Sequence, residues 1–526
     1  MQGTAEYSET KSDKLGAAAD FLQKYRWAFV SVLLAFIAIA ATSQSAVKLF
    51  WWDELASYDV AKLPHAADVW SFFRAGLDTP SPVPTLIVQA TLHLIGSTEV
   101  LARLPFEIGF FLMCLCLYGV TARRYSAGYA LAALILPALM GAFYFASELR
   151  TYGIVLGAVS VSLYCWQNVE RRGPTRILGL LGIFAGLALS ILCHAFAIFV
   201  MVPFTVAQFT RDWRARRIDI PVWIAMLLAP ICLVTELPGM HAAHQYYGSS
   251  FWAKPNLSAM IWSYSYALGT GWMIAVILLL LACPPLQRRF AAARTPGTDR
   301  GFSVPEWVMI ALLAAQPLIA WPFSHFIGVY VARYTIALTI GVTLLIVAAI
   351  AEATKRNRLT GFALALIFAV AFAQDKHRMI SEAMHSHQAL AVQLQQQPWV
   401  KVLEESSLPV IAPNTPVYTQ LQHYASPALE PRLYYTLNTP SALRLDEDPG
   451  AELSMKLFST RLPFLRVQEF SDFTRQHPSF LILVESPLPP SFNPGNYTTH
   501  LIGSYKAPEK FGVSYFSVYQ VDVNSQ

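Results

Sequence analysis

Repeated apolar segments constrain the fold of this chain more than any other feature of its sequence. The first runs from Trp27 to Val47, and eleven others precede residue 374, at 83–96, 104–121, 127–146, 152–168, 177–193, 195–209, 218–237, 261–282, 304–323, 329–350 and 359–373. A helix that crosses a bilayer needs about 20 apolar residues, and most of these segments approach that length. We therefore predict a polytopic α-helical membrane protein.

The composition excludes the main water-soluble classes. Of the 526 residues, 55% are hydrophobic and 13% are charged, and the mean hydropathy is +0.42. A soluble domain is about a quarter charged, so these values exclude a disordered chain, a coiled coil and an ordinary soluble enzyme. The net charge of +5 lies mostly in short loops, where it indicates orientation in a membrane and not nucleic-acid binding.

Basic loops between the apolar segments predict the topology. Arginine-rich stretches lie at 123–124, 170–176, 211–217, 287–300 and 355–358. The positive-inside rule places such loops in the cytoplasm. Alternation then requires that the short segment 83–96 is re-entrant, which gives about 11 crossings and an external C-terminus. If 83–96 spans the membrane, another segment must change too, so we expect about 11–13 transmembrane segments.

The start of the chain is predicted to be a cytoplasmic tail, residues 1–26, followed by a transmembrane domain, residues 27–373. The first apolar run is longer than the core of a signal peptide, about 7–15 residues, so we expect a retained helix. Cleavage near Ala46 is the alternative. Within the transmembrane domain, residues 48–82 form the predicted external first loop.

Residues 374–526 have the composition of a soluble domain, with many prolines and mixed charge. The sequence at 375–405 is helical in character, and 477–486 and 513–523 read as a buried and an alternating strand. These features predict a small external α/β or α+β domain. The six cysteines lie within or beside apolar segments and predict free thiols, not disulfides or a metal site: Cys114, Cys116, Cys165, Cys193, Cys232 and Cys283.

Charged residues at the edges of the apolar segments are the candidates for chemistry. An ionisable group in a bilayer costs roughly 2.5–3.5 kcal/mol on insertion scales, so each one needs a reason. The predicted topology gathers most of them at the external membrane face: Asp53, Glu54, Arg103, Glu107, Glu148, Arg150, His194, His325 and Arg333. This arrangement favours a site that handles the polar group of a lipid.

Each candidate also has a structural interpretation. Asp53 and Glu54 suit a proton acceptor, but acids are also favoured at a helix N-terminus by the helix dipole. Arg150 suits a phosphate ligand, but Glu148 and Arg150 also suit an ion pair at a helix end. The remaining candidates are open in the same way: Arg103 could pair with Glu107, Arg333 could anchor a helix at the interface, and His194 could be a core residue.

The order of these motifs resembles the GT-C superfamily of polyprenyl-phosphate-dependent glycosyltransferases. The matching pieces are "WWDELAS" (51–57), "STEVLARLPFEIGF" (97–110), "YFASELRTYGI" (144–154) and "VARYTIAL" (331–338). The chain is most similar to the bacterial relatives of protein O-mannosyltransferases and of the lipid A aminoarabinose transferase. The family usually carries His-Pro-Pro at the start of the second apolar segment, and here that triplet is Pro80-Ser81-Pro82, so the histidine has no equivalent.

The resemblance implies an inverting transfer of a hexose or pentose from a polyprenyl-phosphate donor to an acceptor hydroxyl. It implies a multi-pass protein of the inner (plasma) membrane that acts in cell-envelope glycosylation, with a periplasmic active site and C-terminal domain. The implied partners are the lipid-linked sugar, membrane lipid and a glycan, lipid or protein acceptor, without nucleic acid. No cofactor or metal is expected, although oligosaccharyltransferases of the superfamily use a divalent metal.

The resemblance also implies roles for individual residues. Asp53 would be the general base, and Glu54 would orient the acceptor or assist. The implied ligands of the donor phosphate are Arg150 and Arg333, followed by Arg103, Lys48 and His194, with Glu148, Tyr152 and Tyr334 in support. The leaving group is a phosphate, whose growing charge needs fixed cations.

A multi-pass transporter or flippase for a lipid-linked or small solute is the competing class, since many spans and intramembrane charges fit it too. Two features oppose it: the sequence has no detectable repeat relating two halves, and the polar residues gather at one face instead of the midplane. A non-catalytic scaffold that presents residues 374–526 is a third reading, but it leaves the order of acids and arginines unexplained.

Overall fold

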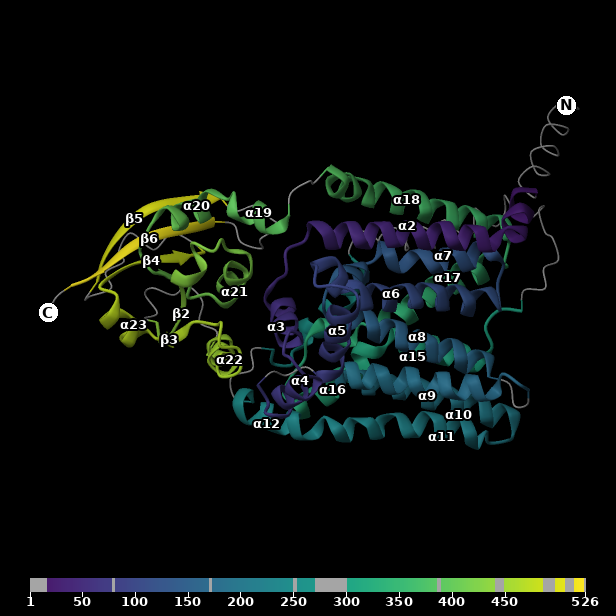
Figure 1. Cartoon of the computed structure of the whole chain (residues 1–526). Helices are drawn as coiled ribbons and strands as arrows, with labels where there is room; N and C mark the ends of the chain where they lie inside the picture. Colours follow the sequence, from purple (N-terminus) through teal and green to yellow (C-terminus); the bar gives the residue numbers. More distant parts are fainter. Residues whose placement is uncertain are drawn as a thin grey trace, which may run out of the picture. The chain divides into compact units, whose positions relative to one another are not determined.

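The computed structural model divides the chain into two compact units (Figure 1). The first unit comprises Met1–Gln44, Arg103–Leu237 and Ala253–Ser381, and the second comprises Ser45–Ala102, Pro238–Trp252 and Glu382–Gln526. The structure describes residues 17–77, 81–169, 173–248, 253–269, 300–385, 389–439, 449–485, 497–506 and 515–524. The units are not continuous in sequence, and the boundaries at residues 26 and 373 remain predictions about the membrane.

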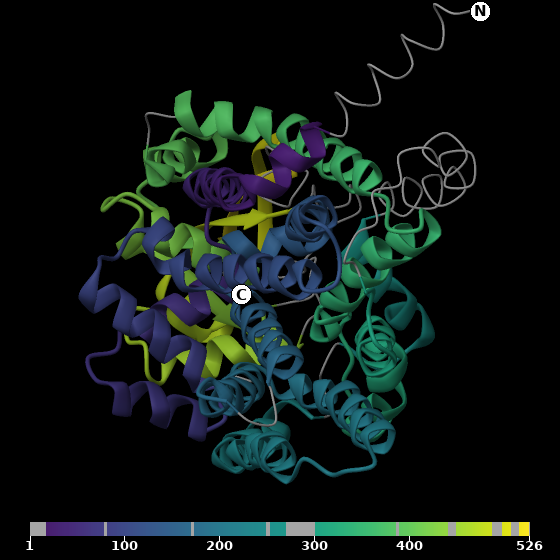
Figure 2. The same cartoon turned by 90° about the vertical axis from the view of Figure 1, so that its right-hand side faces the viewer.

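The first unit consists of apolar helices that lie roughly parallel, and Figure 2 views many of them end-on. Long helices α8 and α9 pack together, as do α15 and α17, and Phe36 of α2 contacts Phe372 of α18. The helices are α2 (Arg26–Val47), α6 (Glu99–Ala122), α7 (Ala127–Leu139), α8 (Tyr152–Asn168), α9 (Arg176–Cys193), α10 (Met201–Ala215), α11 (Ile220–Leu228), α13 (Leu257–Leu268), α15 (Val304–Ala314), α16 (Gln316–Ile327), α17 (Leu338–Ala353) and α18 (Arg358–His385).

Several predicted spans are broken helices. The segment 127–146 is α7 followed by the 3-10 helix η1 (Gly141–Ser147) at 74°, and 304–323 is split between α15 and α16 at 52°. Pro137 and Pro317 lie near these breaks, and a proline inside a helix removes one backbone hydrogen bond. Three further 3-10 helices belong to this unit: η2 (Ala195–Val200), η3 (Ala229–Thr235) and η5 (Ala332–Thr335).

By length and composition, four helices in the described part of the chain are able to cross a membrane, or up to seven when each bent pair is one span. The expected number of crossings therefore remains a prediction. Most of the predicted span 261–282, the basic loop at 287–300 and Cys283 lie outside the described residues. The other five cysteines are free thiols, as predicted.

Glycines allow α6 and α8 to approach closely. A Cβ atom at Gly153 would lie 2.4 Å from the carbonyl oxygen of Phe106, and one at Gly109 would lie 2.4 Å from the carbonyl oxygen of Gly153. Small residues at such contacts let two helix backbones pack without intervening side chains. This contact fixes the N-terminal end of α8, which directly follows Arg150.

The second unit contains the segment that we predict to be the external first loop. Residues 48–82 form α3 (Trp52–Ala61) and α4 (Ala66–Arg74), and the unit also holds α5 (Pro82–Leu94) and α12 (Leu237–Tyr247). Helix α5 has 13 residues, about 20 Å at 1.5 Å per residue, which is shorter than the hydrocarbon core of about 30 Å. The re-entrant character of 83–96 remains a prediction.

The C-terminal part of this unit is a mixed α/β domain, as predicted. Its six strands have the order β3-β2-β1-β4-β6-β5, in which β1 to β4 pair in parallel and β5 and β6 in antiparallel. The strands are β1 (Val410–Ile411), β2 (Leu433–Leu437), β3 (Val467–Glu469), β4 (Ser479–Val484), β5 (Tyr497–Lys506) and β6 (Tyr515–Val523). The helices are α19 (Leu390–Gln395), α20 (Pro398–Glu405), α21 (Thr415–Tyr424), α22 (Pro449–Ser459) and α23 (Phe470–Gln476), with the 3-10 helix η6 (Glu430–Arg432).

The two predicted strands correspond to β4 and β6. Strand β4 is buried from Phe480 to Val484, as its continuous apolar run predicts. Strand β6 does not alternate between buried and exposed residues over Phe516–Tyr519, because Trp399 of α20 covers Phe516 and the sheet core covers Tyr519. The apolar helical bundle and this sheet domain confirm the predicted fold class.

Candidate active site

The predicted acidic pair lies at the start of α3 in the second unit. Trp51 precedes the helix, and its main-chain N–H donates to Glu54 Oε2 at 3.3 Å in a capping box. Glu54 is fully buried, and Lys48 Nζ lies 4.0 Å from the same oxygen. Asp53 is only partly buried and sits in the first turn, where the helix dipole favours a negative charge. The structure therefore separates the two acids into a buried anchor and a more accessible carboxylate.

A third carboxylate on α3 is one that sequence reasoning missed. Asp59 is buried, and its Oδ1 lies 3.7 Å from Lys62 Nζ. Burial raises the pKa of Asp59 to about 6, while Lys62 partly opposes this rise. The Tyr58 hydroxyl donates to the Ser97 carbonyl at 2.7 Å, and burial raises the pKa of Tyr58 to about 12. These contacts hold the second half of α3 against the segment that follows α5.

Cationic and aromatic residues from three distant segments meet in the first unit. Arg333, in η5, donates from Nε to the Tyr152 hydroxyl at 3.0 Å, at the first residue of α8. The His194 ring lies 5.6 Å from the Tyr152 ring and 4.6 Å from the Tyr334 ring, between centroids. Arg150 and Arg333 are both partly exposed. These five residues form what we call the arginine cluster.

His194 is neutral within this cluster. It lies between α9 and η2, where burial lowers its pKa to about 3, helped by the positive charges of Arg150 and Arg333. The guanidinium groups of Arg150 and Arg333 therefore both lie near the His194 imidazole. At neutral pH, His194 therefore offers hydrogen bonding but no positive charge.

Aromatic and acidic residues surround the arginine cluster. Glu148 is buried, and the Arg150 N–H donates to its carbonyl at 2.7 Å, which fixes the short turn between η1 and α8. Tyr266 of α13 interacts electrostatically with Glu148, Arg333 and Tyr152. Phe145 packs its ring 4.6 Å from Tyr152, between centroids. Tyr266 lies outside the quoted motifs and Phe145 lies within one of them, but neither side chain is charged, so neither was selected as a candidate.

Arg103 is fully buried near the start of α6, four residues before Glu107, which is also buried. The Thr42 hydroxyl of α2 donates to Glu107 Oε2 at 3.2 Å. A guanidinium without surface exposure is less accessible to a ligand than the partly exposed Arg150 and Arg333. The structure thus brings Arg150, Tyr152, His194, Arg333 and Tyr334 together in one unit, while Lys48, Asp53 and Glu54 belong to the other.

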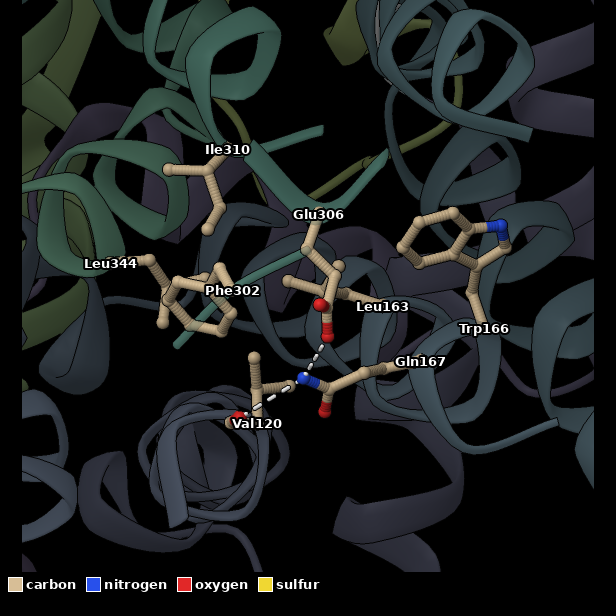
Figure 3. Close-up of a pocket in the computed structure, with 8 residues that line it drawn as sticks. All are labelled: Val120, Leu163, Trp166, Gln167, Phe302, Glu306, Ile310 and Leu344. Atoms are coloured by element: carbon tan, nitrogen blue, oxygen red, sulfur yellow. Dashed lines mark hydrogen bonds between the residues drawn. The ribbon is translucent and has the colours of Figure 1, made fainter. Parts of the chain in front are cut away.

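A second polar network lies at the other end of α8 and was not predicted (Figure 3). Gln167 Nε2 donates to Glu306 Oε1 at 2.7 Å and to the Val120 carbonyl at 3.1 Å, and Arg124 Nε donates to the same Glu306 oxygen at 2.9 Å. Gln167, Glu306 and Val120 border a small pocket with apolar walls from α6, α8, α15 and α17. The network ties α6, α8 and α15 together with the loop after α6, and Glu306 is its one buried carboxylate.

The side chains do not form an evident metal centre. Within the part of the chain that the structure describes, no three His, Cys, Asp or Glu residues are grouped so that they could hold a metal ion. Of the triplet 80–82, Ser81 caps α5 by accepting a hydrogen bond from the Val83 N–H, and Pro82 begins that helix, while Pro80 lies outside the described residues.

Comparisons with known proteins place the chain in a class. Residues 78–238 match the family model for dolichyl-phosphate-mannose-protein mannosyltransferase. The structure is similar to that of apo ArnT from Cupriavidus metallidurans, with a TM-score of 0.51 and 13% identity over 94% of this chain and 98% of that one. The fold is therefore similar to that of ArnT, and the two matches agree with the predicted resemblance.

Two further similarities are weaker. ArnT from the same organism bound to undecaprenyl phosphate gives a TM-score of 0.39 at 14% identity, over 94% of this chain and 98% of that one. An oligosaccharyltransferase from Archaeoglobus fulgidus, in complex with zinc and sulfate, gives a TM-score of 0.44 at 12% identity, over 86% of this chain and 67% of that one. No curated protein sequence matches the chain.

Proposed function

We propose that this protein transfers a hexose or pentose from a polyprenyl-phosphate donor to an acceptor hydroxyl on the external face of the inner membrane. The convergence of Arg150, Arg333, Tyr152, His194 and Tyr334 carries the proposal. Guanidinium groups bind phosphate oxygens in fixed bidentate geometry, and neighbouring hydroxyl and imidazole groups add hydrogen bonds. Membrane-spanning helices that carry such a cluster suit a ligand with a phosphate head and a lipid tail.

The chemistry is one displacement that inverts the anomeric carbon. The acceptor oxygen forms a bond to that carbon while the bond from the carbon to the phosphate oxygen breaks. The electron pair leaves with the polyprenyl phosphate, and the hydroxyl proton passes to Asp53. Arg150 and Arg333 stabilise the charge that grows on the phosphate, which makes protonation of the leaving group unnecessary.

Asp53 is better suited to act as the base than Glu54. Glu54 is occupied at the start of α3 by the Trp51 N–H and by Lys48, so we assign it a supporting role in orienting the helix. Asp53 is partly exposed in the same turn, and a carboxylate there can accept the proton of an acceptor hydroxyl. The proposed reaction uses no cofactor or metal, and chelation of divalent cations is expected to leave the rate unchanged.

Two findings support the proposal: the family match over residues 78–238 and the similarity of the fold to that of ArnT. Both point to glycosyltransferases of the GT-C superfamily. The test supplies membranes containing the protein with radiolabelled polyprenyl-phosphate sugars and follows label into products that lack the polyprenyl chain. Release of label from at least one donor is expected. If no donor releases label from the folded protein, the transporter interpretation replaces the proposal.

A further inference from the structure

The C-terminal domain forms hydrogen bonds with the chain immediately before α3, the helix that carries Asp53 and Glu54. Both main-chain polar groups of Phe50 are bonded to α21: the Phe50 N–H donates to the Tyr424 hydroxyl oxygen at 2.9 Å, and Gln420 Nε2 donates to the Phe50 carbonyl at 2.9 Å. All of these residues belong to the second unit. Phe50 lies three residues before Asp53, so α21 fixes the backbone that leads into the first turn of α3.

Aromatic packing between α21, Phe50 and α3 adds to these hydrogen bonds. The His423 ring lies 5.8 Å from the Phe50 ring and 5.4 Å from the Tyr58 ring, between centroids, and Phe50 and Tyr58 are themselves 5.0 Å apart. Phe50 is fully buried, and Tyr58 and Tyr424 are almost so. Burial lowers the pKa of His423 to about 4, so its ring is neutral and packs as an aromatic group at neutral pH. Helix α21 therefore holds both the residue that precedes α3 by two positions, Phe50, and the second turn of α3, at Tyr58.

Helix α21 is itself attached to the sheet of the C-terminal domain. The Thr415 hydroxyl donates to the Tyr435 hydroxyl of β2 at 3.2 Å, and the Tyr418 ring packs 5.6 Å from the Tyr435 ring. Gln395 of α19 donates to the Tyr424 carbonyl at 2.9 Å. The position of Phe50 is therefore fixed by a helix that is itself attached to the sheet.

We propose that Gln420 and Tyr424 are positioning residues that set the orientation of Asp53 through the Phe50 main chain. The inference rests on the proposed function, in which Asp53 is the base. A base that is displaced by about 1 Å loses much of its rate advantage, with costs on the order of 100-fold. The C-terminal domain then contributes to proton transfer without touching the donor.

The test compares Gln420→Met and Tyr424→Phe in the full-length protein, because both changes remove one polar contact and keep the size of the side chain. Gln422→Met, two residues along the same helix, is the matched control. We expect kcat to fall about tenfold in the two variants, with the donor KM within about twofold of wild type. An unchanged kcat, or a donor KM that rises in step with the loss of kcat, overturns the proposal.

A double-mutant cycle separates positioning from general destabilisation. In an Asp53→Asn background, Gln420→Met is expected to cause no further loss, because a residue that acts through Asp53 has no effect without it. Additive losses contradict the positioning role. Absence of transfer by the wild type refutes the proposed function itself, whereas transfer by the wild type with an unaffected Gln420→Met refutes only the role of α21.

Discussion

Single residues decide how the arginine cluster presents its charge. The guanidinium of Arg333 donates from Nε to the Tyr152 hydroxyl at 3.0 Å, and this bond helps to orient it. A hydrogen bond to a charged group contributes about 1.5–3 kcal/mol, so losing it is expected to loosen Arg333.

Tyr152→Phe tests this orientation. We expect the affinity for polyprenyl phosphate to fall about tenfold, since the ring remains while the acceptor of the Arg333 bond is lost. Tyr164→Phe, on the exposed side of the same helix α8, is the control and should bind as the wild type does. Equal affinity of the Tyr152→Phe variant and the wild type would show that the hydroxyl does not position Arg333.

Asp59 makes a residue-scale prediction about pH. Its pKa is raised to about 6 in the folded protein, above the ordinary value, so the folded state holds this proton more tightly than the unfolded state. The stabilising contribution is therefore complete below pH about 4 and is lost as pH rises through about 6. We expect the thermal stability of the purified protein to fall across this interval.

Asp59→Asn should flatten that part of the stability profile, because asparagine does not titrate. Asp68→Asn, at the start of α4, is the control, since it replaces another carboxylate of the same loop. A profile for Asp59→Asn that still falls between pH 4 and 6, as in the wild type, would remove Asp59 as the cause.

At the scale of helices, the apolar segments predicted where helices form but not where they break. An apolar run indicates that a helix is buried in lipid or protein, but it does not indicate the direction of the helix axis. Pro137 was therefore the single sequence feature near the 74° bend after Leu139. The motif around Glu148 and Arg150 was informative because charge is costly in an apolar region. Tyr266 and Phe145 could not be selected in this way, because neutral aromatic residues are common in apolar helices.

The contact of α6 with α8 gives an element-scale prediction. Gly153→Ala would place a Cβ atom 2.4 Å from the Phe106 carbonyl oxygen, so the two helices must separate. The shift should displace Tyr152 and weaken donor binding severalfold, along with thermal stability. Gly179→Ala in α9 meets only the Val169 side chain at 3.3 Å and should change both quantities less. Donor affinity that is equal in the two variants would contradict this account.

At the scale of the whole molecule, the compact units of the structure do not follow the order of the sequence. The sequence treats residues 48–82 as part of the transmembrane domain, whereas the structure includes them in the compact unit of the C-terminal domain. The contacts responsible join residues about 370 positions apart, such as Phe50 with Gln420, and no periodic pattern reports such pairs. The predicted roles of Asp53, Arg150 and Arg333 therefore remain predictions that activity must test.

The central claim is that Asp53 takes the proton of the acceptor while the arginine cluster binds the donor. The most direct measurement loads wild type and Asp53→Asn with the same radiolabelled donor and follows both donor affinity and the rate of transfer, with Asp68→Asn as control. We predict that Asp53→Asn binds donor within about twofold of the wild type and transfers at least about 100-fold more slowly. Transfer by Asp53→Asn at the wild-type rate would contradict the account.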